Sequence, residues 1–156
     1  MLVLTLPPPV SANRYWATRV ITPKGGSRPM ALTYVTPEAK HYREQVAWIA
    51  RGAGARQPLQ GRIAVDLKLY PHRPQDWKTR QRKLGAAWDD SVQCIDLTNA
   101  EKVLMDALNG VAFEDDKQVR RYTAERMEPD EHGARVVLTI QAIAEPALQG
   151  ELEAWA

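Results

Sequence analysis

The strongest constraint on the fold is a strict alternation of apolar and polar or small residues over positions 62–70. Ile63, Val65, Leu67 and Leu69 fall on one side of an extended chain, because successive side chains of a strand point to opposite faces. This pattern predicts a strand with one buried face. Such a strand needs other elements, most simply helices, to cover that face of its sheet.

Two patterns before this strand predict one more strand and one helix. Leucines alternate with other residues over positions 2–6, and three prolines then end the strand. Thr36 precedes Pro37 and Glu38, which is a favourable helix start, and apolar residues recur at helical spacing to about Arg51. We therefore expect an amphipathic helix over residues 37–51.

The second half of the chain predicts a helix and two strands. Apolar residues at helical spacing extend from Asn99 to Gly110, where the glycine ends the helix. Residues 119–127 and 136–143 have strand character, and the turn-forming residues between them predict a hairpin. This order of elements predicts an α+β fold, with a mixed β-sheet and two main helices packed on one face.

The length of 156 residues is typical of one domain, which we assign to residues 1–156. Within it, residues 71–91 form a basic insertion, and the tail from about residue 145 is expected to be weakly structured. The short apolar run at the N-terminus has no basic residue before it and ends at prolines. We therefore predict no signal peptide, no membrane association and a cytoplasmic location.

Charge is unevenly distributed. Residues 1–88 contain 15 Lys and Arg and 4 Asp and Glu, whereas residues 89–156 contain 6 and 15. This division suits a protein that binds a polyanion with one region and cations with another, although intermixing of the two halves would neutralise it. Cys94 is the only cysteine and the three histidines lack ligand-like spacing, so a bound metal would need oxygen ligands.

The candidate chemistry lies around the second predicted helix. Asp96 precedes this helix, and Asp115 and Asp116 follow it. The helix spans ~18 Å, but an extended return from Gly110 can cover that distance at ~3.3 Å per residue, so Asp96 and Asp116 can meet at the helix's N-terminal end. Clustered carboxylates are stable mainly around a cation such as Mg²⁺. The alternative is a solvated acidic turn.

A divalent ion held there suits phosphodiester hydrolysis. It would polarise the phosphoryl oxygen, lower the pKa of the attacking water and neutralise the leaving oxygen. Lys102, which lies further along the same helix from Asp96, would add positive charge where the transition state is most negative.

These residues resemble the core motif of the RusA family of Holliday junction resolvases. In that family Asp-x-Asp-Asn-x-x-Lys leads to Asp-Ala-Leu and then to Asp-Asp-x-Gln-Val. The pattern is met here by Asp96, Asn99, Lys102, Asp106-Ala107-Leu108 and Asp115-Asp116-Lys117-Gln118-Val119. The family's opening is similar to Pro7-Pro8-Pro9 followed by Asn13-Arg14-Tyr15.

The resemblance implies a homodimeric endonuclease that places paired symmetrical nicks in a four-way DNA junction. It implies catalysis by Asp96, Lys102 and Asp116, with the metal held by Asp96 and Asp116 and assisted by Asp115. The expected cofactor is Mg²⁺, for which Mn²⁺ can substitute. The expected partners are branched DNA and a second copy of the chain, with no small-molecule cofactor.

Thr98 stands where the family motif has its second aspartate. A hydroxyl is a weaker, neutral ligand, so Asp115, Asp66, Glu101 or water would have to replace the missing carboxylate, or the protein binds junctions and cuts them poorly. Thr98 and Glu101 also match a capping box, in which Thr98 is the helix N-cap.

Two neighbouring motif residues also have structural alternatives. Asn99 either orients a carboxylate or satisfies the first turn of the helix. Asp106 is expected to be a structural partner of Lys102 four residues earlier rather than a metal ligand.

Two basic segments are candidates for DNA contact. The first is a polar, aromatic loop over residues 11–29, which contains Asn13 and Arg14. The second is the insertion over residues 71–91, where tryptophans accompany Arg73, Lys78, Arg80, Arg82 and Lys83. The alternative for each is a solvated connection, with a short helix in the insertion.

Two other functions compete with a nuclease. One is a non-catalytic four-way junction binding protein with a degraded metal site, and the other is a structural or adaptor domain with no DNA role. Glycine-rich phosphate loops, nucleophile elbows and metal-binding histidine pairs are absent from the sequence, so no small-molecule enzyme is predicted.

Overall fold

The computed structural model describes residues 1–26 and 28–145, and the predicted weakly structured tail lies almost wholly outside them. Its centre is a four-stranded sheet in the order β1-β6-β4-β5. The four strands are β1 (Leu2–Leu6), β4 (Ile63–Tyr70), β5 (Val119–Arg126) and β6 (Arg135–Ala142). β6 is antiparallel to both β1 and β4, and β5 is parallel to β4, so the sheet is mixed as predicted.

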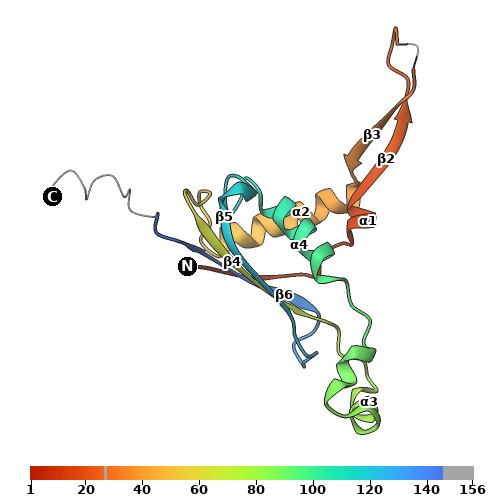
Figure 1. The fold of residues 1–156 in the computed structure, drawn as a ribbon, viewed down its shortest axis with the longest axis vertical. Helices are drawn as coiled ribbons and strands as arrows, with labels where there is room; N and C mark the ends of the chain where they lie inside the picture. Colours follow the sequence, from red (N-terminus) through yellow and green to blue (C-terminus); the bar gives the residue numbers. More distant parts are fainter. Residues whose placement is uncertain (27, 146–156) are drawn as a thin grey trace, which may run out of the picture.

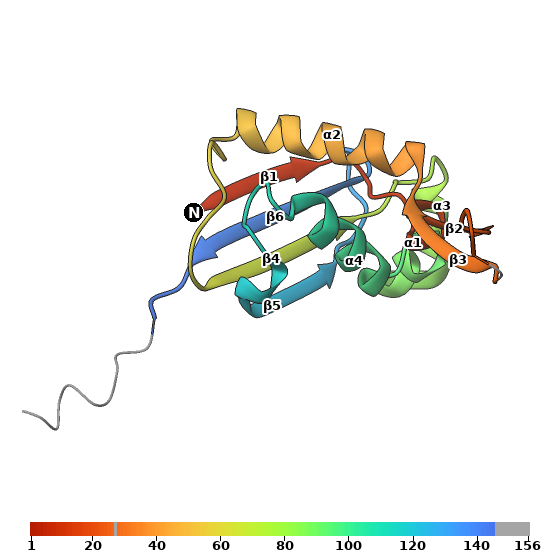
Figure 2. The ribbon, with the colours of Figure 1, turned by 90° about the horizontal axis from the view of Figure 1, so that it is seen from above.

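Two long helices, α2 (Pro37–Gly52) and α4 (Leu97–Leu108), lie along the same face of this sheet (Figure 2). α2 begins as its sequence predicts, because the Thr36 hydroxyl accepts a hydrogen bond from the Ala39 N–H at 3.2 Å and Pro37 occupies the first turn. This arrangement confirms the predicted α+β fold. No helix among the described residues is long and apolar enough to span a membrane.

The hydrophobic core lies between the sheet and these two helices. The alternating residues of β4 point into it, and burial of each aliphatic side chain contributes roughly 1.5–3 kcal/mol. The other fully buried side chains of the sheet and helices include Leu4, Leu6, Val46, Val103, Leu104, Leu108, Leu138 and Ile140. The opposite face of the sheet is polar, and there the Thr123 hydroxyl donates to the Asp66 carboxylate.

β5 and β6 do not form the predicted hairpin, because β4 lies between them. Val65 is paired with Tyr122 of β5 on one side and with Ile140 of β6 on the other. The strand patterns were correct, but alternation reports which face a strand buries and not which strand it pairs with. A parallel pair needs a long crossover connection, and the chain between β4 and β5, which includes α4, supplies it.

The predicted loop over residues 11–29 is also partly wrong. It contains the short helix α1 (Ala12–Tyr15) and strand β2 (Trp16–Ile21), which pairs with β3 (Met30–Val35) in an antiparallel hairpin. This β2–β3 hairpin projects from the body of the molecule (Figure 1). Most of its residues are exposed on both faces, so the sequence lacks the apolar alternation that identifies a half-buried strand.

The insertion over residues 71–91 forms a second projection, built from α3 (Trp77–Leu84) and the 3₁₀-helix η1 (Gly85–Ser91) (Figure 1). Trp88 is buried, and its indole N–H donates to the Glu128 carboxylate at 2.7 Å. Its ring centroid lies 6.1 Å from that of Trp77. These tryptophans therefore pack the insertion together and join it to the chain after β5.

Replacing Trp88 with alanine should lower the free energy of unfolding by about 3 kcal/mol, because it removes a buried indole and its hydrogen bond. Urea unfolding followed by far-UV circular dichroism measures the change. Trp48, which is 78% exposed, provides the matched control, and Trp48→Ala should change the value by less than about 0.5 kcal/mol. Equal effects of the two substitutions would contradict this role of Trp88.

Candidate active site and DNA-contacting residues

Asp96 is the residue immediately before α4. Its carbonyl accepts the first helical hydrogen bond, from the Ala100 N–H at 2.9 Å, whereas its side chain caps no backbone N–H. The exposed carboxylate is instead contacted by the side-chain amide of Asn99 at 3.4 Å. Asn99 was expected either to orient a carboxylate or to satisfy the first turn of the helix, and this long contact with Asp96 favours the first role.

Thr98 is not the N-cap of α4, which corrects the capping-box prediction. The helix begins at Leu97, so Thr98 is already its second residue, and its side chain is exposed. Asp96 takes the N-cap position two residues earlier. The Thr98 hydroxyl therefore lies in the same exposed first turn as Asp96 and Asn99.

Lys102 continues this exposed surface of α4 and makes no ion pair with any residue in the ranges 1–26 and 28–145. Its expected partner, Asp106, instead accepts a hydrogen bond from the Tyr15 hydroxyl and lies 3.9 Å from Nε of Arg43. The structural role predicted for Asp106 is thus present with different partners, and the Lys102 ammonium group is free for another anion.

The hydrogen bond from Tyr15 to Asp106 connects two distant sequence motifs. Tyr15 is fully buried, and burial together with the neighbouring carboxylate raises the pKa of its hydroxyl far above the ordinary value. The Tyr15 carbonyl also accepts from the Thr36 N–H at 2.9 Å, and the Thr36 hydroxyl donates to the Arg14 carbonyl at 2.7 Å. These bonds fix α1, and the base of the β2–β3 hairpin that follows it, against α2 and α4.

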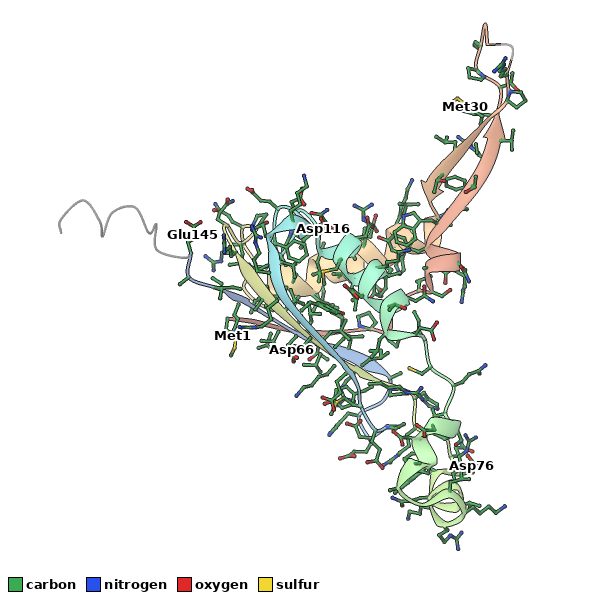
Figure 3. All side chains as sticks on the ribbon, viewed as in Figure 1. Met1, Met30, Asp66, Asp76, Asp116 and Glu145 are labelled. Carbon is green, nitrogen blue, oxygen red and sulfur yellow. The ribbon has the colours of Figure 1, made fainter. Side chains whose placement is uncertain are left out.

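Asp115 and Asp116 lie beyond the other end of α4, where Figure 3 labels Asp116. Asp115 is the N-cap of the 3₁₀-helix η2 (Asp116–Gln118), and its carboxylate accepts from the Lys117 N–H at 2.9 Å. That bond and a hydrogen bond shared with Asp116 lower the pKa of Asp115. Gln118 accepts from the Asp115 N–H at 3.0 Å, so these motif residues build a tight turn into β5.

The expected meeting of Asp96 and Asp116 does not occur within one chain. α4 returns along the parallel pair β4 and β5, so Asp96 lies where these strands end and Asp116 lies where β5 starts. The return after Gly110 is a compact turn rather than an extended segment, with the Gly110 N–H donating to the Phe113 carbonyl at 2.7 Å. The helix alone separates its two ends by ~18 Å.

One chain therefore supplies an incomplete set of metal ligands. Within residues 1–26 and 28–145, no group of three or more His, Cys, Asp or Glu side chains is placed to hold an ion. Of the proposed replacements for the missing carboxylate, Asp66 is held by Thr123 and Asp115 caps η2. Glu101 lies near Tyr122, whose pKa is raised by burial and by this carboxylate.

Three of the arginines and lysines predicted to contact DNA are engaged within the protein. Arg14 pairs with Glu38 at 2.5 Å, and Arg80 pairs with Asp76 at 2.9 Å. Arg73 lies 4.0 Å from Glu131 and stacks on the Trp77 ring. Of the arginines and lysines predicted to contact DNA, the remaining three are exposed and make no ion pair in the described part of the chain: Lys78, Arg82 and Lys83, all on α3.

Arg126 is a structural residue of this region that the sequence did not reveal. Its guanidinium group donates to the carbonyls of Asp89 and Val92 at 3.0 and 2.7 Å. It thereby ties the segment before Asp96 to the end of β5. A single arginine in a strand pattern carries no signal for such a bond.

The family of this chain follows from its match to a known protein family. The model of the family "Endodeoxyribonuclease RusA" matches residues 6–141, which include both long helices and the whole motif. The chain belongs to the RusA family. Its activity is that of a Holliday junction resolvase, an endonuclease of DNA crossover junctions, and RusA-family nucleases depend on a metal ion. No match is found among curated proteins.

In this RusA-family nuclease, Tyr15→Phe should lower the free energy of unfolding by about 2 kcal/mol, because the part-buried Asp106 carboxylate loses its donor. Chemical denaturation measures the loss. Tyr34→Phe, in the exposed hairpin, removes the same hydroxyl at a surface site and should cost less than about 0.5 kcal/mol. If the two variants were equally stable, the bond would not anchor α1 to α4.

Proposed function

We propose that this RusA-family nuclease resolves four-way junctions by paired symmetrical nicks with Mg²⁺, for which Mn²⁺ can substitute. The proposed catalytic residues are Asp96, Lys102 and Asp116, with Asp115 assisting as a ligand from the same turn as Asp116. The observation that supports it best is the exposed start of α4. There a carboxylate with an amide beside it lies at the start of the same helix as a lysine that makes no ion pair with the described residues.

A homodimer is part of this proposal because α4 keeps Asp96 and Asp116 of one chain apart. Two copies related by a two-fold axis can bring the Asp96 end of one chain to the Asp116 end of the other. That arrangement creates two identical sites, one for each nick. In such a dimer, the metal ligands that one chain lacks at each site would come from the other chain.

Each side chain then has a defined task. Asn99 holds the Asp96 carboxylate in place, and Lys102 offers a positive charge to the phosphate that is cut. Thr98 leaves the site with one negative charge fewer than the family motif, which weakens metal attraction but also weakens repulsion of the DNA backbone. A bound divalent ion supplies polarisation of the phosphoryl oxygen and activation of water.

DNA contact is proposed for α3 and for α1. On α3, Lys78, Arg82 and Lys83 are free to meet phosphates, while Arg73 and Arg80 shape the surface that presents them. Asn13 and Arg14 on α1 are exposed and are held close to α4 by the bonds around Tyr15. Both segments lie toward the end of the sheet where α4 starts (Figure 2).

A second candidate is a junction-binding protein without cleavage, and Thr98 is the observation that favours it. Incubation of a labelled four-way junction with the protein, with and without Mg²⁺, separates the two. Symmetrical nicks that need the metal support the nuclease. Intact strands together with a normal gel shift support the binding protein.

Asp96→Asn should reduce junction cleavage by roughly 100-fold or more, because it removes a charged ligand of the ion. Junction affinity should stay the same or improve, since one repulsion with phosphate is lost. Asp90→Asn changes the same charge at an exposed nearby position and should leave cleavage unchanged. Normal cleavage by the Asp96 variant would remove this residue from the site.

Mixing two inactive variants tests whether sites are shared between chains. An equimolar mixture of Asp96→Asn and Asp116→Asn chains should recover nicking, because each mixed dimer contains one site with both aspartates intact. Random pairing leaves about one quarter of the wild-type number of sites. Mixing either variant with itself gives the baseline. A mixture no more active than that baseline would mean that each site lies within one chain.

A further inference from the structure

The β2–β3 hairpin is exposed to an extent that the fold itself does not explain. Directly opposed residues share a face of a two-stranded ribbon, so Arg19 lies beside Leu32, and Ile21 beside Met30, on one face. Leu32 is 38% and Met30 51% exposed, and Val20 on the other face is 72% exposed. An isolated two-stranded ribbon is marginally stable in water, and this one would gain from a partner.

The charge of the hairpin points to the kind of partner. Residues 11–37 contain four arginines and lysines and no acidic residue. Arg14 at the base pairs with Glu38, but Arg19, Lys24 and Arg28 make no ion pair with any residue in 1–26 or 28–145. Three uncompensated positive charges along one ribbon favour a polyanion, and they would repel the same hairpin of a second copy.

The position of the hairpin relates it to the candidate site. It projects on one side of the α4 start and α3 projects on the other, and both extend from the same end of the molecule (Figures 1 and 2). Tyr15 immediately precedes β2, and its hydrogen bond to Asp106 fixes the base of the hairpin to α4. DNA held at Asp96 would therefore run between two basic projections.

We propose that the β2–β3 hairpin is a DNA-binding arm that lies along one duplex arm of the junction. In this arrangement, backbone phosphates are contacted by Arg19, Lys24 and Arg28. The exposed apolar residues of the ribbon pack against the major groove of the DNA, which is wide enough for a two-stranded ribbon. The proposal rests on the proposed function for its substrate. It adds a contact surface, opposite α3, that sets affinity and junction orientation without taking part in the chemistry.

The test compares two charge-matched double variants. Arg19→Gln with Arg28→Gln removes two charges from the hairpin, and Arg51→Gln with Arg56→Gln removes two exposed charges at the far end of α2. Binding of a labelled four-way junction is measured by fluorescence anisotropy without divalent metal, over a series of salt concentrations. The hairpin pair should bind about 10-fold more weakly at low salt, and its salt slope should fall by about 1.8, or about 0.9 per lost phosphate contact.

The other outcomes are equally specific. The α2 pair should bind like wild type, and Lys24→Gln alone should lower the slope by about 0.9. Equal effects of the two pairs would overturn the proposal, because only general charge would matter. Unchanged affinity of the hairpin pair would also overturn the proposal. So would a hairpin variant that sediments as a monomer where wild type is a dimer, because the hairpin would then belong to an interface between copies. Wild-type protein that neither binds nor cuts the junction would instead defeat the proposed function.

Discussion

The parallel pairing of β4 with β5 is the constraint on which the rest of the structure depends. Two neighbouring parallel strands require the chain to travel back along the whole sheet before the second can start. α4 makes that return, and its stripe of buried residues from Ala100 to Leu108 anchors it over the sheet. Residues that flank this helix closely in sequence consequently lie at opposite ends of the β4–β5 pair. The separation of Asp96 from Asp116 follows directly from this topology.

The residues of the motif divide into two physical roles once the fold is known. The Asp106 carboxylate accepts from the Tyr15 hydroxyl, and the Gln118 side chain accepts from the Asp115 N–H, so these two side chains hold elements together. Asp96 and Lys102 make no comparable bond to another element among the described residues. A side chain that the fold leaves exposed and charged is available for substrate or metal, and this distinction cannot be made from a motif alone.

Local patterns were sufficient for much of the fold. The strand β4 and the helix α2 follow from apolar periodicity and from the Thr36-Pro37 start, and both lie within a residue or two of their predicted bounds. Periodicity failed where a segment buries neither face, as in the β2–β3 hairpin. It failed again for the pairing of β5, because a parallel partner is a property of topology and leaves no mark in the strand's own residues.

The candidate site was predicted only in its parts. The sequence identified the charged residues around α4, but two local rules misplaced their partners. Thr98 matched a capping box, yet Asp96 occupies the N-cap, and Asp106 lay four residues from Lys102, yet a buried tyrosine from another element takes its carboxylate. For Asp106, a tertiary hydrogen bond prevailed over a helical side-chain pair worth only about 0.2–0.5 kcal/mol. The site that we propose to be shared between two chains could not be predicted either, because the local patterns of one sequence do not reveal where a second copy lies.

The most direct test of a metal site shared between two chains is Mn²⁺ binding, measured by electron paramagnetic resonance at protein concentrations above and below those at which dimers form. If Asp96 of one chain and Asp116 of the other hold the ion, Mn²⁺ affinity should rise as dimers form, and Asp96→Asn and Asp116→Asn should each weaken it. A diluted monomer that binds Mn²⁺ as tightly as the dimer would contradict the account.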